Sequence, residues 1–90
     1  MERVHLIIHG RVQGVLFRHH TKNTAQSLGI KGYVRNKPDG TVEVVAEGTI
    51  SELKRLIDFC KKGPRAAKVL KVDCKYEIPR NEFDDFDITY

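Results

Sequence analysis

The sequence lacks any hydrophobic run long enough to cross a membrane. A run such as Leu6–Ile8 spans only three residues, whereas a membrane-spanning helix needs about 20. The N-terminus also lacks the apolar segment that a secretory signal requires. We therefore expect a cytoplasmic protein with no membrane partner.

Cysteine is scarce. The two cysteines, Cys60 and Cys74, lie fourteen residues apart, which is neither the spacing of a zinc site nor a disulfide framework. Both fall on predicted core faces, so we interpret them as free, buried thiols. A disulfide between them, which would need close approach and an oxidising setting, stays open as the alternative.

Repeats, low-complexity tracts and linkers are absent from the 90 residues. A chain of this length makes one compact domain that buries somewhat more than ~60% of the surface of its unfolded state. We therefore assign residues 1–90 to a single domain.

A continuous basic stripe is missing as well, although Lys and Arg exceed Asp and Glu by 16 to 12 and the net charge is +4. The charges are scattered, apart from acidic residues gathered within 82–87. The net charge favours an anionic partner such as a small phosphorylated substrate. The scatter argues against a nucleic-acid backbone.

The hydrophobic periodicity divides the chain into alternating strands and helices. Val4, Leu6 and Ile8 alternate with less apolar residues and predict a first strand that ends at Gly10. A helix is predicted from Phe17 to the stop at Gly29, followed by a strand over 32–36, a turn over 37–40 and a strand over 41–47. A second helix begins with the capping-box spacing of residues 49–52 and closes at Gly63-Pro64. The next strand carries Leu70, Val72, Cys74, Tyr76 and Ile78, and a short last strand or edge segment contains Phe86, Ile88 and Tyr90.

This βαββαβ order is typical of the ferredoxin-like α+β sandwich. In that fold two helices cover one face of an antiparallel sheet, and the other face can remain solvated. Because the architecture hosts enzymes, RNA-binding modules and regulatory domains, the function has to come from a site.

The segment Gly10–Arg18 is the first candidate site. Glycines at 10 and 14 let the backbone turn its amides inward as a nest for an anion. The helix that follows adds its free N–H groups and the positive end of its dipole. Arg18 stands where the loop becomes helix and can hold two oxygens of a phosphate or carboxylate at once. The alternative is a crossover loop with a surface arginine.

Asn36 is the second candidate, at the end of a predicted strand. Its place before Lys37–Gly40 suits a residue that starts a turn. If its side chain faces the anion nest instead, the amide can hold a water molecule and aim it at phosphorus.

These residues belong to a wider set of motifs. The set comprises Val12-Gln13-Gly14-Val15-x-Phe17-Arg18, then Thr21, Ala25 and Leu28-Gly29, then Gly32-Tyr33-Val34-Arg35-Asn36, Asp39-Gly40-x-Val42 and Gly63-Pro64. Together they resemble the acylphosphatase family over nearly the whole chain, and Phe86, Ile88 and Tyr90 look like that family's closing strand.

The resemblance implies a hydrolase that splits the carboxyl–phosphate bond of acyl phosphates into a carboxylate and inorganic phosphate, without a metal or other cofactor. It implies that Asn36 orients the attacking water and that Arg18 binds the phosphoryl group with the loop residues Val12, Gln13, Gly14, Val15, Leu16 and Phe17. Such a sparse site suits the chemistry. The leaving carboxylate is a stable anion, so positioning and charge stabilisation supply most of the catalysis.

Other functions fit the sequence less well. His5 and His9 share a strand face, but their Cα atoms would lie about 13 Å apart, too far to chelate one metal ion. Lys31-Gly32-Tyr33 begins like an RNA-recognition signature, yet the aromatic positions that should follow are missing. A domain that keeps the fold and binds without turnover is the remaining alternative. The sequence defines neither the oligomeric state nor the acyl group, whose preference depends on side chains at the mouth of the site.

Overall fold

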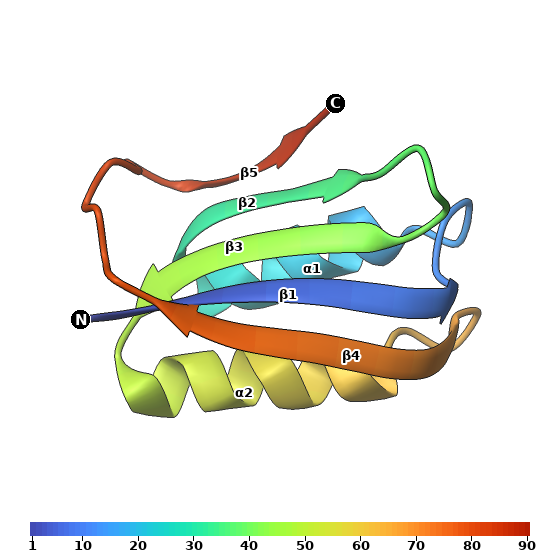
Figure 1. The fold of residues 1–90 in the computed structure, drawn as a ribbon, viewed down its shortest axis with the longest axis horizontal. Helices are drawn as coiled ribbons and strands as arrows, with labels where there is room; N and C mark the ends of the chain where they lie inside the picture. Colours follow the sequence, from blue (N-terminus) through green and yellow to red (C-terminus); the bar gives the residue numbers. More distant parts are fainter.

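Five strands form one sheet, and both helices cover the same face of it (Figure 1). The computed structural model describes residues 1–90, and the strands lie in the order β4-β1-β3-β2-β5. The elements are β1 (Glu2–Arg11), α1 (Phe17–Ser27), β2 (Lys31–Asn36), β3 (Val42–Gly48), α2 (Ile50–Lys62), β4 (Lys68–Glu77) and β5 (Phe86–Thr89). The predicted ferredoxin-like sandwich is confirmed.

One strand pair departs from the antiparallel sheet that the sequence predicted. β5 runs parallel to β2, with Gly32 opposite Phe86 and Val34 opposite Ile88. The cause is the path of the chain, because β4 ends at the end of the sheet where β2 begins (Figure 1). Residues 78–85 need only cross that end before the chain continues alongside β2 in the same direction.

The core lies between the sheet and the helices and follows the predicted periodicity. β1 and β3 alternate inward, and each helix presents its predicted apolar stripe. The predicted inward residues that are fully buried are Val4, Leu6, Ile8, Val42, Val44, Ala46, Thr21, Ala25, Leu53, Leu56 and Cys60. The periodicity therefore identified the layer that holds the sheet and the helices together.

The ends of α2 also match the sequence. The Thr49 hydroxyl accepts from the Glu52 N–H at 3.2 Å, and a Glu52 carboxylate oxygen accepts from the Thr49 N–H at 3.0 Å, which completes the capping box. Gly63 ends the helix with φ 73°. Neither helix has the length and apolar character that a membrane crossing requires.

β4 is where the sequence prediction was wrong about burial. Leu70 is 71% exposed, Cys74 is exposed, and Ile78 lies beyond the end of the strand. β4 is an edge strand with β1 as its only neighbour, and a register shift between His9 and Gly10 changes which residues face the core. Cys74 is therefore an exposed thiol rather than a buried one, and both cysteines are free.

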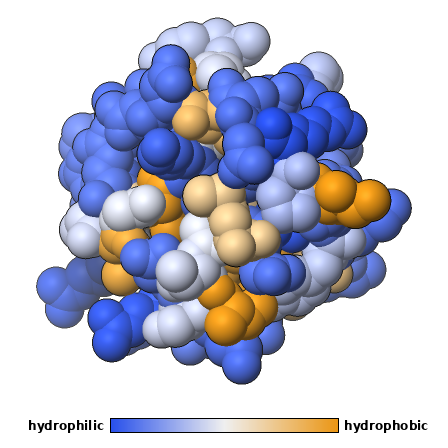
Figure 2. Space-filling model, turned by 90° about the vertical axis from the view of Figure 1, so that its left-hand side faces the viewer, coloured by the Kyte–Doolittle hydropathy of each residue, from blue (hydrophilic) through white to orange (hydrophobic).

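The end of the molecule that carries the N-terminus is largely hydrophilic. Figure 2 shows this end, with hydrophobic residues in several small groups among hydrophilic ones. Exposed apolar side chains scattered in this way are ordinary for a folded domain.

Candidate active site

The segment that joins β1 to α1 forms one wall of a cavity at the opposite end of the sheet. The cavity measures about 220 Å³ and lies where β2 ends and α1 begins. Its lining residues are Val12, Gly14, Leu16, Phe17, Arg18, His19, Asn36 and Ile88. The fold thus brings Arg18 and Asn36, eighteen positions apart in the chain, to one hollow.

Gly10, which the sequence placed in the anion nest, has a different role. It lies inside β1 at the register shift, with φ 128°, and pairs with β4. A Cβ atom there would lie 2.1 Å from the Lys68 carbonyl oxygen. The missing side chain lets two strands approach, and Gly14 is the glycine that lines the cavity.

The N-terminus of α1 opens into the cavity without a cap. Leu16, at the N-cap position, makes no side-chain hydrogen bond to the helix, and the first turn holds no acidic residue. The first four N–H groups of a helix have no partner inside it and carry the positive end of the dipole. With Phe17, Arg18 and His19 lining the hollow, this end of α1 suits an anion.

Arg18 brings a full positive charge to the same place. It is the second residue of α1, it is half-buried, and it makes no ion pair. The Tyr90 ring lies against it, with the guanidinium carbon 5.1 Å from the ring centroid. Cation–π contact of this kind orients the guanidinium and leaves its N–H donors free for an anion.

Asn36 supplies a polar atom with no partner in the protein. Asn36 is the last residue of β2 and lines the cavity. Its Oδ1 is buried and accepts no hydrogen bond. A side-chain amide that lines such a cavity can hold a water molecule through its carbonyl or its N–H groups.

Gln13 has its side chain turned away from the cavity. Its amide group donates to the Lys37 carbonyl at 2.8 Å and to the Thr41 carbonyl at 2.9 Å. These two bonds tie the loop to the turn between β2 and β3, next to Asn36. Of the predicted binding loop, Val12, Gly14, Leu16, Phe17 and Arg18 line the cavity, whereas Gln13 and the half-buried Val15 do not.

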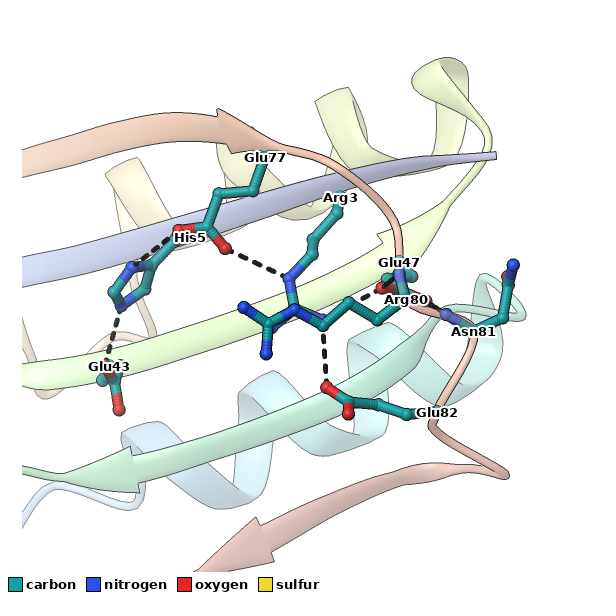
Figure 3. Close-up of polar contacts among 8 residues, drawn as sticks. All are labelled: Arg3, His5, Glu43, Glu47, Glu77, Arg80, Asn81 and Glu82. Carbon is teal, nitrogen blue, oxygen red and sulfur yellow. Dashed lines mark hydrogen bonds and ion pairs between the residues drawn. The ribbon is translucent and has the colours of Figure 1, made fainter.

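The sequence analysis missed an ionic network on the open face of the sheet (Figure 3). The Arg3 side chain, only 7% exposed, donates to Glu47 at 3.0 Å, Glu77 at 3.1 Å and Glu82 at 3.4 Å. Glu47, 2% exposed, also accepts the backbone N–H groups of Arg80 and Asn81. The network fastens the segment after β4 to the sheet.

The charges of this network stabilise one another. Burial alone would raise the pKa of Glu47, but hydrogen bonds from the Arg80 N–H, from Arg3 and from the Asn81 N–H bring that pKa below its usual range. The sequence carried one signal for this network. Residues of opposite charge stand at alternate positions in the first and third predicted strands. Their pairing needed the register that places Arg3 opposite Glu47.

His5 and His9 lie on this open face and contact carboxylates. His5 Nε2 lies 2.7 Å from Glu43, and His9 Nε2 lies 2.9 Å from Asp73. Burial opposes the charge of Glu43, but hydrogen bonds from Arg35 and His5 lower its pKa overall. The two histidines therefore contact carboxylates on the open face of the sheet and do not line the cavity.

Comparison with known proteins gives one consistent result. Residues 4–88 match the acylphosphatase family. The chain is 48% identical over 90 residues to the acylphosphatase of Syntrophus aciditrophicus, covering 100% of this chain and 94% of that protein. It is 48% identical over 88 residues to the acylphosphatase of Cupriavidus pinatubonensis, covering 98% and 96%. The crystal structure of acylphosphatase from Bacillus subtilis superimposes with a TM-score of 0.96 at 32% identity over 100% of both chains.

Proposed function

Because the chain belongs to the acylphosphatase family, we propose that it hydrolyses the carboxyl–phosphate bond of small acyl phosphates, in the cavity described above. The products are a carboxylate and inorganic phosphate. The observation that carries the assignment of the site is that Arg18 and Asn36 line one cavity.

The phosphoryl group binds between Arg18 and the N–H groups of the loop and of the first turn of α1. Amides and a guanidinium aimed at the phosphoryl oxygens stabilise the charge that spreads over them in the transition state. Since these donors are in place before substrate binds, they need little rearrangement during the reaction. The segment Val12–Phe17 with Arg18 thus acts as a phosphate-binding loop.

Asn36 holds the attacking water. Its Oδ1 accepts a hydrogen bond from the water and directs the water oxygen at phosphorus, in line with the bond to the acyl oxygen. The new P–O bond forms as that bond breaks, and the acyl group departs as a carboxylate with the electron pair. A phosphoryl oxygen of the substrate takes the proton from the water. A leaving carboxylate needs no protonation, so no strong acid is required.

The charge of the phosphoryl group is balanced by Arg18 and by amide dipoles, so the reaction as proposed needs no metal ion or cofactor. Residues 1–90 act as one domain, in the cytoplasm. The two free cysteines, one of them exposed, support a reducing compartment.

Turnover of benzoyl phosphate in a buffer with EDTA tests the proposal. The wild type should hydrolyse it, and Arg18→Ala should lose at least about 10²–10³-fold in kcat/KM, the typical loss for one donor to a developing anion. Arg18→Lys should recover little, because a lysine cannot donate two parallel bonds. Arg55→Ala removes an exposed arginine of α2 and serves as the matched control. Near-normal turnover in a folded Arg18→Ala protein would show that the site is wrong.

A further inference from the structure

Leu16 breaks three local preferences at once. It is 69% exposed, it has φ 61° and ψ 22°, and it occupies the N-cap of α1 without offering a side-chain cap. Glycine or asparagine would take the left-handed backbone more readily, and Asn, Ser, Thr or Asp would cap the helix. Since neither helix stability nor burial explains a leucine here, its side chain has to be considered for what it contacts outside the chain.

Leu16 lines the cavity and is one of four apolar side chains in its lining. The polar groups of the cavity are Arg18, His19 and Asn36, and the other side chains are Val12, Leu16, Phe17 and Ile88. Val12 and Phe17 are buried, which leaves Leu16 and the half-buried Ile88 as the accessible apolar groups. No acidic side chain lines the cavity.

The cavity is also larger than a phosphoryl group requires. Even if each of the five heavy atoms of phosphate occupied the ~30 Å³ of a liquid water molecule, they would fill about 150 Å³. The cavity measures about 220 Å³. With phosphate held by Arg18 and the amides, Leu16 and Ile88 are the accessible apolar side chains of the lining that an acyl group can contact.

We infer that Leu16 and Ile88 form an apolar subsite for the acyl group, so that the protein prefers acyl phosphates with an apolar or aromatic acyl group over acetyl phosphate. This inference rests on the proposed function, because it concerns the leaving group of the same reaction. Apolar contact with an acyl group wider than acetyl removes hydrocarbon surface from water and favours the larger substrate.

The test compares kcat/KM for benzoyl phosphate and acetyl phosphate in the wild type and in two variants. Leu16→Asn keeps a residue that tolerates the left-handed backbone and removes the apolar surface, and Leu16→Gly removes the whole side chain. The ratio of benzoyl to acetyl kcat/KM should fall by roughly 3–10-fold in both, less than the 10–200-fold of a closed hydrophobic pocket because this one is open. Leu70→Asn, at an exposed leucine of β4, is the matched control and should keep the wild-type ratio.

The outcomes separate the two proposals. A ratio that falls in both Leu16 variants and stays constant in Leu70→Asn supports the subsite. Folded, active Leu16 variants with the wild-type ratio would overturn the subsite and leave the hydrolase intact. A wild type that hydrolyses neither substrate would overturn both.

Discussion

Replacing Gln13 by leucine removes the two hydrogen bonds that hold the segment Val12–Leu16 to the turn after β2. The Gln13 amide donates to the carbonyls of Lys37 and Thr41, and Asn36 directly precedes Lys37 in the chain. Leucine matches the size of glutamine and donates nothing. The substitution therefore tests whether Gln13 fixes the position of Asn36 relative to the phosphate-binding loop.

The magnitude follows from those two bonds. Each contributes about 0.5–1.5 kcal/mol net, so the free energy of unfolding should fall by about 1–3 kcal/mol. A displacement of about 1 Å in a reacting group costs up to about 10²-fold in rate, so kcat should fall between about 10- and 100-fold. Urea denaturation and steady-state kinetics with benzoyl phosphate measure the two effects.

Gln26→Leu is the matched control. Gln26 donates one hydrogen bond to the Phe86 carbonyl at 3.1 Å, between α1 and β5, and its loss should lower stability with little change in kcat. The positioning role further requires that Gln13→Leu have almost no effect on kcat when Asn36 is already alanine. An equal fold-loss in kcat in the presence and absence of Asn36, or no larger loss than in Gln26→Leu, would show that Gln13 does not position Asn36.

Three further predictions concern the fold. Glu47→Gln should lower the free energy of unfolding by about 1–3 kcal/mol at neutral pH. Because folding lowers the pKa of Glu47 from 4.5, the carboxylate stabilises the fold above that value, and this stabilisation is lost as the pH falls through the folded pKa. In urea titrations the stability of the variant should therefore fall less steeply with acid than that of the wild type, and an unchanged acid profile would contradict this. Gly32→Ala should destabilise the protein by about 2 kcal/mol or more, since a Cβ atom there would lie 1.9 Å from the Val45 carbonyl oxygen at φ 145°; wild-type stability would mean that β2 and β3 do not approach so closely. Iodoacetamide should modify Cys74 in the native protein and Cys60 only after unfolding, because Cys60 is buried and burial raises the pKa of its thiol to about 12; mass spectrometry that finds Cys60 modified first would contradict the packing of α2.

Periodicity predicted the buried layer because burial in β1 and in both helices repeats along the chain. It failed in β4, where Leu70 and Cys74 alternate as a core strand would but lie at a sheet edge, which no local pattern marks. The parallel pairing of β5 was equally hidden, since it depends on where β4 ends. Such features arise from the arrangement of whole strands rather than from the residues within one.

For the candidate site, too, the sequence predicted some features and only the structure shows others. The motifs in the sequence predicted Arg18 and Asn36 as site residues, and the structure places both on one cavity. The direction of each side chain was not available from the motif. Only the structure reveals that Gln13 faces the turn, that the Asn36 Oδ1 has no partner and that Leu16 extends the lining.

If Arg18 binds the phosphoryl group while Asn36 orients the water, phosphate binding and turnover separate in Asn36→Ala. The inhibition constant of inorganic phosphate, measured beside kcat in this variant, tests the two roles. Asn36→Ala should bind phosphate as the wild type does, within about threefold, while its kcat falls by about 10²-fold or more. Arg18→Ala, measured in parallel, should lose phosphate binding. Loss of phosphate binding in Asn36→Ala, or an undiminished kcat, would contradict the division of roles on which the mechanism rests.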